Sequence, residues 1–549
     1  MNKPDYNALL RSFWSSPTIT ESIEDNTKNE IEGYITDFLG ENILWQEIVP
    51  SQIPNLEPMP DNLPPELIEV LQKNGITQLY SHQLSALSAL RKGKDVIITT
   101  TTASGKTLSA YPAILEGCLN KGYRAISFYS LKALALDQFN KISTLLAGIP
   151  EATRPKLAML TGDIKTEERE RLLAANPHII GATPELIHYQ LRASWRSEHW
   201  SAFFKKLRYI LVDESHLYSS VMGASMALLL RRIKLAVDHH GGKSAKLQFI
   251  FLSATVGNPV QLAQRLSGRS RDQNRLVLID KSGAAASEKQ LLVLKPSTNA
   301  NPDAAKIILY LLKQGMSGIT FCNSRQAVKS LLGLVKIEAI RQRCQGYEDK
   351  VAIFYGSLTS DRRAEIIEQL QSGQIRFIIS TEALEAGIDL PELDCCLIRG
   401  WPGSIMSFRQ RIGRSGRARP GLAIFLPVAQ SPLDQYFSSY PTLLLSGEAE
   451  QVNFNESYPI LLAKHLLCAC VETGIPTNKL KRYFGPTAPK VVTALMQQDQ
   501  IFKGRKGLWA KGFPHKDVNF RGGSSSGTIK LIDADLSLYV RSFCRCERN

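Results

Sequence analysis

The sequence predicts an α/β protein with two doubly wound parallel sheets in tandem. Short β-rich runs at 95–99, 125–129, 178–181, 208–212 and 248–252 alternate with helical patterns, which is the βαβ rhythm of a parallel sheet. The same rhythm returns at 317–322, 351–354, 375–380 and 394–398. Between the two stretches, 268–305 is polar and charged apart from an apolar β-like patch at 276–295, so we expect it to connect two domains.

The chain length fits several domains. At 549 residues the prior is about three to four domains, each with its own core. The predicted organisation is an N-terminal extension (1–60), a first sheet domain (61–275), a second sheet domain (276–435) and a C-terminal region (436–549). A Pro-rich segment at 53–65 is expected to act as a linker or strap.

The charge of the chain indicates which binding partners to expect, and its cysteine content indicates which cellular compartment to expect. Lys plus Arg total 66 against 51 Asp plus Glu, a formal net charge of +15, which favours a polyanionic partner such as nucleic acid, although many soluble proteins are mildly basic. The nine cysteines form no CxxC pair, which suits a reducing cytosol. Cys468 and Cys470 are expected to be core residues of a helix, and Cys544 and Cys546 lack the second pair that a metal site needs. The N-terminus has no apolar segment typical of a secretion signal, and the sequence has no apolar run of about 18 residues. Neither secretion nor membrane insertion is therefore predicted.

A phosphate-binding loop is predicted after the strand at 95–98. The loop ends in Gly105-Lys106-Thr107 and leads into a helical pattern, so backbone N–H groups and the helix N-terminus can cradle phosphates. Lys106 would reach the β- and γ-phosphates, and the Thr107 hydroxyl would ligate Mg²⁺. Thr100 stands where a strict motif has its first Gly, and a chance Gly-Lys-Thr turn is the alternative. The residues expected to surround the phosphates are Thr100, Thr101, Thr102, Ala103, Ser104 and Gly105.

Two further strand ends carry residues suited to nucleotide chemistry. The strand at 208–212 runs into Asp213-Glu214-Ser215-His216, a Walker B arrangement in which Asp213 would hold Mg²⁺ and Glu214 would polarise the attacking water. A solvated acidic turn is the alternative. Ser253-Ala254-Thr255 follows the strand at 248–252. Many Ser/Thr turns have this composition, so the segment supports a nucleotide site only together with the other motifs.

A basic segment in the second domain predicts charge stabilisation. On a helix, Gln410, Arg414 and Arg417 stand at i, i+4 and i+7 and would share one face. Two guanidiniums together can stabilise charge on transferring phosphate oxygens. The alternative is a basic helix that binds RNA or phosphate without a catalytic duty.

In combination, these motifs resemble those of a superfamily 2 helicase. The finer likeness is to the DEAD/DEAH-like DNA helicases of the mitomycin repair factor A (YprA-like) group and their RecQ-four-like relatives, and it runs from about residue 55 to 535. It rests on LYSHQ at 79–83, LKALALDQ at 131–138, SATVGNP at 253–259, ALEAGIDLPELD at 383–394, SPLDQYF at 431–437, AKHLLCACVETGIP at 463–476 and the segment 507–533.

The resemblance implies two tandem RecA-like domains, a winged-helix-like segment, ATP and Mg²⁺ as cofactors, and 3′→5′ movement on DNA in repair. The partner would be single-stranded DNA or a junction of single strand and duplex, in the cytoplasm or at the nucleoid. By position, Gln83 matches the adenine-reading Gln, and Arg414 and Arg417 match the arginine fingers. Further matches are the coupling residues His216, Ser253, Ala254 and Thr255, the second-domain nucleotide contacts Gly387 and Asp389, and the strand-backbone contacts Lys132, Thr183 and Arg325.

Two departures from the family pattern leave alternatives open. Ser130-Leu131 replaces the usual Pro-Thr, and the chain ends at Asn549, whereas these helicases usually continue into a four-cysteine metal-binding domain. A truncated product, one part of a split gene and a short variant all fit. The alternatives to a DNA helicase are an RNA remodeller, an ATPase that translocates without unwinding, and a non-catalytic DNA-binding scaffold. The basic hairpin at 503–511 would act as a duplex wedge, or its domain would pack only against the motor.

Overall fold

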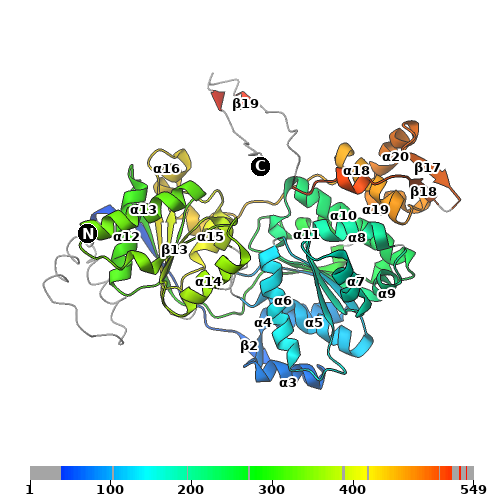
Figure 1. Ribbon diagram of the computed structural model, residues 1–549, viewed down its shortest axis with the longest axis horizontal. Helices are drawn as coiled ribbons and strands as arrows, with labels where there is room; N and C mark the ends of the chain where they lie inside the picture. The colour runs from blue at the N-terminus through cyan, green and yellow to red at the C-terminus, as the bar shows by residue number, and fades with distance from the viewer. Residues whose placement is uncertain are drawn as a thin grey trace.

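The structure is a computed structural model in which two sheet domains lie side by side (Figure 1). The residues it describes are 39–101, 104–130, 132–194, 196–269, 273–385, 390–416, 419–505 and 507–521, with two short strands at 531–532 and 539–540. The first sheet domain, called lobe 1, has a seven-stranded sheet of order β10-β4-β9-β8-β5-β7-β6, with every pair parallel. Its strands are β4 (Asp95–Ile98), β5 (Arg124–Phe128), β6 (Leu157–Leu160), β7 (Ile179–Ala182), β8 (Leu207–Val212), β9 (Gln248–Leu252) and β10 (Leu276–Ile279).

Helices cover both faces of the lobe 1 sheet because successive strand residues point to opposite faces. Val96 and Ile98 of β4 belong to one buried cluster, while Ile97 between them belongs to the other. One face packs against α3 (Pro65–Lys73), α4 (Ser81–Arg91), α5 (Lys106–Lys121) and α6 (Lys132–Ala147). The other packs against α7 (Thr166–Ala174), α8 (Pro184–Ser194), α9 (Glu198–Lys206), α10 (Ser220–His239) and α11 (Pro259–Ser267). The predicted doubly wound sheet is confirmed.

The second sheet domain, lobe 2, repeats this plan with one antiparallel edge. Its sheet has the order β1-β11-β16-β15-β12-β14-β13, parallel except for β1 against β11. The strands are β1 (Ile43–Val49), β11 (Lys289–Leu294), β12 (Gly318–Phe321), β13 (Val351–Phe354), β14 (Phe377–Ser380), β15 (Cys395–Arg399) and β16 (Gly421–Leu426). The helices are α12 (Ala300–Lys313), α13 (Arg325–Arg341), α14 (Ser360–Gln371), α15 (Ile405–Ile412), α16 (Pro432–Ser439) and α17 (Leu443–Ser446).

The chain crosses between the lobes more than once. β1, within the predicted N-terminal extension, joins the lobe 2 sheet, whereas β2 (Leu56–Pro58) pairs with β3 (Gln78–Tyr80) of lobe 1. β10 lies past the predicted boundary at 275 and still completes the lobe 1 sheet. The two crossings form a paired ribbon: Gln52 N donates to Ala286 O (2.7 Å), Ala286 N donates to Gln52 O (3.0 Å), and Asn55 N donates to Gly283 O (2.8 Å).

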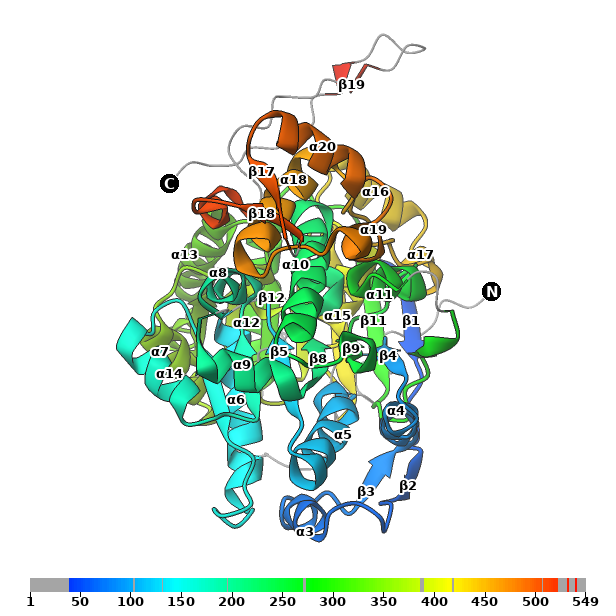
Figure 2. The ribbon, with the colours of Figure 1, turned by 90° about the vertical axis from the view of Figure 1, so that its right-hand side faces the viewer.

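The C-terminal region forms a small domain that sits on lobe 1 (Figure 2). It contains α18 (Pro459–Glu472), α19 (Leu480–Phe484), α20 (Ala488–Gln497) and the hairpin β17 (Ile501–Gly504)–β18 (Gly507–Ala510). Leu228 and Leu235 of α10 share a buried cluster with Leu462 and Leu466 of α18. Cys468 and Cys470 are buried on α18, as predicted.

A buried polar network joins this domain to lobe 1. Arg232 of α10, fully buried, donates to Glu472 through Nε (3.1 Å) and Nη2, and its Nη1 lies 2.8 Å from His188 Nδ1. His515 Nε2 lies 2.7 Å from Glu472 Oε1. Burial and the Arg232 charge lower the pKa of His188 to about 2, so this imidazole is neutral and can accept from the guanidinium.

Residues 449–456, here called the strap, tie the connection between lobe 2 and α18 to the surface of lobe 1. The Asn258 amide donates to Val452 O (3.1 Å) and accepts from Val452 N (2.8 Å). Ser220 N donates to Asn453 O (2.8 Å), and Gly257 N donates to Glu450 O (3.0 Å). The Glu450 carboxylate in turn accepts from Ile405 N (2.6 Å) and Met406 N (3.1 Å), the first amides of α15 in lobe 2.

Among the described helices, none combines the length and apolarity needed to cross a bilayer. Over the same residues, no group of three or more His, Cys, Asp or Glu gathers as a metal site. Cys544 and Cys546 lie outside the described part of the chain.

Candidate nucleotide and nucleic-acid site

The predicted phosphate loop connects β4 to α5. Gly105 caps α5 with φ +72°, a backbone conformation that favours glycine, and a Cβ there would displace the Gln83 amide, whose Nε2 would lie at 2.7 Å. Thr100 is not among the residues with positive φ, and its hydroxyl bonds to Ser104 Oγ at 2.6 Å. The loop therefore closes with a side-chain hydrogen bond where a strict motif has its first glycine.

Lys106 is folded back onto this loop. Its Nζ donates to Thr100 O (3.0 Å) and Thr101 O (3.3 Å). Burial lowers the pKa of Lys106, and the carboxylates of Glu214 and Asp213 oppose that shift. The two carboxylates that follow β8 therefore act electrostatically on Lys106, which follows β4. This is expected because the carboxyl ends of parallel strands lie at one edge of the sheet.

The N-terminus of α4 is fastened to the loop. The Gln83 amide accepts from Tyr80 N (3.0 Å) and donates to Gly105 O (3.1 Å), while His82 Nε2 lies 2.9 Å from Ser104 O. Gln83 is buried and so is not a solvated helix-end residue. Its adenine-reading role stays a prediction, and sequence reasoning missed His82 because a histidine beside a motif carries no signal of its own.

Asp213 and Glu214 follow β8 and are buried side by side. Asp213 Oδ1 accepts from Glu214 N (2.9 Å), and Glu214 adopts φ +45°. Burial, together with the Glu214 carboxylate, raises the pKa of Asp213 to about 7. Two buried acids at one strand end need a cation to be ionised together, which argues against the alternative of a solvated acidic turn.

The residues fit a magnesium ion by their chemistry. Glu214 Oε2 is buried and accepts no hydrogen bond from the described residues. The Thr107 hydroxyl donates to Gln138 Oε1 (2.8 Å), which leaves its oxygen lone pairs for a ligand. Carboxylate and hydroxyl oxygens are the donors that Mg²⁺ prefers. Gln138 was not assigned a role from the sequence, since only the tertiary structure brings it to Thr107.

The residues predicted to couple hydrolysis to movement connect the loop, the acidic pair and lobe 2. Thr255 Oγ1 donates to Thr99 O (3.3 Å), and Ala254 N donates to His216 Nδ1 (3.1 Å). His216 Nε2 lies 3.3 Å from Gln410 Nε2 of lobe 2, so these two side chains meet across the lobes. Ser253 is fully buried, and its hydroxyl has no partner among the described residues.

The predicted common helix face for Gln410, Arg414 and Arg417 is wrong. α15 ends at Ile412, with Gly413 as its cap, so Gln410 is helical and Arg414 is not, while Arg417 lies outside the described residues. The chain then turns into a bridge between Ser415 and Leu393, and Gly416 N donates to Leu393 O (3.2 Å). Sheet pairing ends the helix before Arg414.

Arg414 still lies near Lys106 of the phosphate loop, as predicted for a residue of the same site. It is buried, and its Nε (3.2 Å) and Nη2 (2.7 Å) donate to Glu385 O. Its charge lies close enough to Lys106 to lower the pKa of that lysine further. The Glu385 carboxylate accepts from Arg411 Nε (2.9 Å) and from Ser407 Oγ, so Glu385 organises the segment that carries Arg414. Glu385 lies within a recognised motif, yet nothing in its spacing predicts these bonds.

Five predicted nucleotide-site residues lie outside the described residues: Thr102, Ala103, Gly387, Asp389 and Arg417.

The predicted strand-backbone residues are spread over both lobes. Lys132 begins α6 and forms an ion pair with Asp163. Thr183 immediately precedes α8, and Arg325 begins α13 and is exposed. Their contact with nucleic acid stays a prediction.

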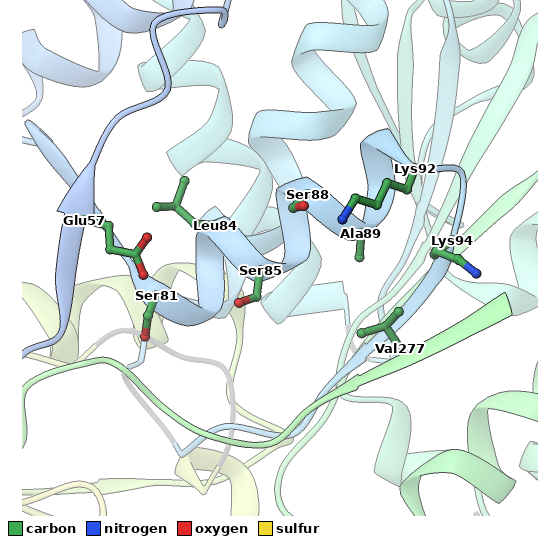
Figure 3. A pocket seen from close by; sticks show the side chains of 9 residues that line it. All are labelled: Glu57, Ser81, Leu84, Ser85, Ser88, Ala89, Lys92, Lys94 and Val277. Carbon is green, nitrogen blue, oxygen red and sulfur yellow. The ribbon is translucent and has the colours of Figure 1, made fainter. Parts of the chain in front are cut away.

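A hollow of about 560 Å³ lies along α4 of lobe 1 (Figure 3). Ser81, Ser85, Ser88 and Lys92 line it from one helix face, opposite Val277 of β10. None of the predicted nucleotide residues lines this hollow, so it is separate from the site above.

Family models match three parts of the chain in order. They are described as DEAD/DEAH box helicase (residues 80–263), Helicase conserved C-terminal domain (303–419) and ATP-dependent helicase HRQ1, winged helix domain (454–523). The last match agrees with the predicted winged-helix-like segment.

Whole-chain relatives point the same way. The chain is 29% identical over 530 residues to the uncharacterized ATP-dependent helicase YprA of Bacillus subtilis, covering 93% of this chain and 67% of that protein. It is 29% identical over 511 residues to ATP-dependent helicase HRQ1 of Saccharomyces cerevisiae, covering 89% of this chain and 46% of HRQ1. The crystal structure of DUF1998 helicase MrfA bound to DNA and AMPPNP is similar with a TM-score of 0.80 and 27% identity, covering 91% of this chain and 69% of MrfA. The chain therefore spans about two thirds of YprA and about half of HRQ1.

Proposed function

Because the chain belongs to the superfamily 2 helicases of the YprA/HRQ1 kind, we propose that it is an ATP-driven motor that moves 3′→5′ along single-stranded DNA and serves DNA repair. The observation that carries the proposal is the meeting of two half-sites. Lys106, Asp213 and Glu214 come from lobe 1 and Arg414 comes from lobe 2, and the lobes touch beside them, where His216 Nε2 lies 3.3 Å from Gln410 Nε2.

This arrangement suits phosphoryl transfer to water. Bound MgATP would supply the phosphoryl group and a metal that neutralises its developing charge. Lys106 and Arg414 would stabilise negative charge on the phosphate oxygens, and Thr107 and Asp213 would hold the metal. Glu214, with an oxygen that accepts no hydrogen bond from described residues, is placed to orient the attacking water.

Movement requires that the state of the site changes the contact between the lobes. The His216–Gln410 contact is a direct link between the acidic pair and lobe 2, because His216 also bonds Ala254 and lies 3.4 Å from Glu214 Oε2. Loss of the γ-phosphate would change the charge next to Glu214 and so the strength of this link. Each cycle would then open and close the lobes around a strand that both hold.

DNA as the track is supported by the charge of +15 and by the relative MrfA, which was crystallised bound to DNA. Contacts made mainly to a sugar-phosphate backbone would bind with little sequence preference and weaken steeply with salt.

The test is ATP turnover with and without a single strand. Lys106→Ala is expected to abolish strand-stimulated turnover while strand binding persists, and Lys121→Ala, at the other end of α5, is the matched control. Undiminished turnover in Lys106→Ala would refute the motor. Stronger stimulation by RNA than by DNA would refute the DNA assignment, and unwinding of 5′-tailed but not 3′-tailed duplexes would refute the direction.

A further inference from the structure

A second hollow, of about 710 Å³, lies where lobe 1 meets the winged-helix domain. Its walls come from the second half of α8, the end of α10, the end of α18 and the segment from β18 to Phe513. These elements lie together on the side of lobe 1 seen in Figure 2. The volume is in the range of ligand pockets, and none of the residues discussed for ATP lines it.

Three aromatic rings line the hollow. Trp509 is held in place by two glycines, since a Cβ at Gly474 would meet its Cζ2 at 2.8 Å and a Cβ at Gly504 would meet its Cδ1 at 2.8 Å. Tyr189 and Phe513 lie with ring centroids 6.2 Å apart and are 44% and 39% exposed. Rings this exposed leave π surface for a ligand to stack on.

The charge of the hollow favours an anion. The Arg192 guanidinium lies 4.1 Å from the Phe513 ring centroid, and Arg196 and His239 are exposed at the same hollow. Glu472 is the one carboxylate among the residues that line it, and Arg232 and His515 engage both of its oxygens. Aromatic faces beside guanidiniums, with the acid already neutralised, suit a base attached to a phosphate.

The position of the hollow relates it to the proposed track. Thr183, a predicted strand-backbone contact, precedes α8, and Arg192 lies nine residues further along that helix. At 1.5 Å per residue, the hollow is about 13 Å from Thr183 along α8. The hollow is therefore lined by the same helix that begins next to Thr183.

We propose that the hollow binds an unstacked base and its neighbouring phosphate from a nucleic-acid single strand, as a second strand site outside the cleft between the lobes. The proposal rests on the proposed function for its choice of a strand over a free nucleotide. In this site Trp509 and Phe513 supply the stacking faces, and Arg192 holds the phosphate.

The test is equilibrium binding of a 24-nucleotide oligo(dT) strand and of dTMP, without ATP, to the whole chain. Phe513→Leu keeps an apolar side chain but removes the π face, and Arg192→Ala removes the charge. Phe513→Leu is expected to weaken strand binding about 5- to 150-fold, the range for loss of one base stack, and Arg192→Ala should weaken it and lower the salt slope by about one. Tyr436→Ala, on α16 of lobe 2 and 48% exposed, is the matched control and should bind like wild type.

Two outcomes would overturn the proposal. One is wild-type strand affinity in both pocket variants when their thermal unfolding matches wild type, and the other is loss of dTMP binding alone with strand binding unchanged. Strand-stimulated ATP turnover of the wild-type chain is measured in parallel. Its absence would refute the motor, whereas its presence with unchanged pocket variants would refute only the second strand site.

Discussion

Replacing Arg232 by Met should release the winged-helix domain from lobe 1. Arg232 is fully buried and bonds Glu472 through two nitrogens, so the variant leaves a buried carboxylate with His515 as its remaining partner from this network. Breaking a buried ion pair from one side costs about 3–5 kcal/mol. At about 1.4 kcal/mol per tenfold, the undocked state becomes at least about 100-fold more populated.

Hydrogen–deuterium exchange of the α18 amides measures this population, since exchange from a locally opened state follows its free energy. We expect exchange in α18 to accelerate about 100-fold or more in Arg232→Met. The double variant Arg232→Met/Glu472→Met removes both charges and should return most of the protection. Arg91→Met breaks a partly exposed pair with Glu116 on lobe 1 and should cost about 1 kcal/mol or less. Exchange in Arg232→Met within threefold of wild type would refute the reasoning.

Three other perturbations address different parts of the molecule. Arg414→Ala should reduce strand-stimulated ATP turnover about 1,000-fold or more with ATP binding retained, as measured by steady-state turnover and nucleotide titration; a loss confined to ATP affinity would contradict a transition-state role. Asn258→Ala removes two hydrogen bonds to Val452 and should destabilise the strap by about 1–3 kcal/mol, seen as faster amide exchange at 449–456, and unchanged exchange would count against it. His188 has a pKa of about 2 when folded and 6.5 when unfolded, so the unfolded chain binds the extra proton. Stability should therefore fall as pH drops below about 6.5, by about 1.4 kcal/mol per pH unit for this group, and His188→Gln should flatten the urea midpoints measured between pH 5 and 7.

Sequence patterns located most of the lobe 1 sheet because its strands are short β-branched or aromatic runs. β6 was missed, since Leu157-Ala158-Met159-Leu160 consists of residues that favour helices as much as strands. β10 and β11 lie in a stretch interpreted as a connection, because pairing partners that are distant in sequence leave no local signal.

The candidate site likewise contains residues that the local sequence predicts and residues that it does not. Lys106, Asp213, Glu214 and their neighbours are predictable because each follows a strand of a parallel sheet, where functional residues collect. The prediction of a helix through Arg414 is wrong because it relied on the i, i+4 and i+7 spacing and gave too little weight to Gly413. The helix ends at Ile412, and the chain then turns so that Ser415 pairs with Leu393. The support that Glu385 gives to Arg414 depends on a contact across 29 residues, which periodicity does not encode.

The paired ribbon at Gln52 and Ala286 restricts the movement of one lobe relative to the other. Two backbone segments that cross side by side and share hydrogen bonds connect the lobes more tightly than one unpaired segment would. A single flexible tether would let lobe 2 tumble and arrive at many orientations. Together with the strap, whose Glu450 bonds both lobes, the ribbon holds lobe 2 to lobe 1 at two places and so restricts the orientations that lobe 2 can adopt.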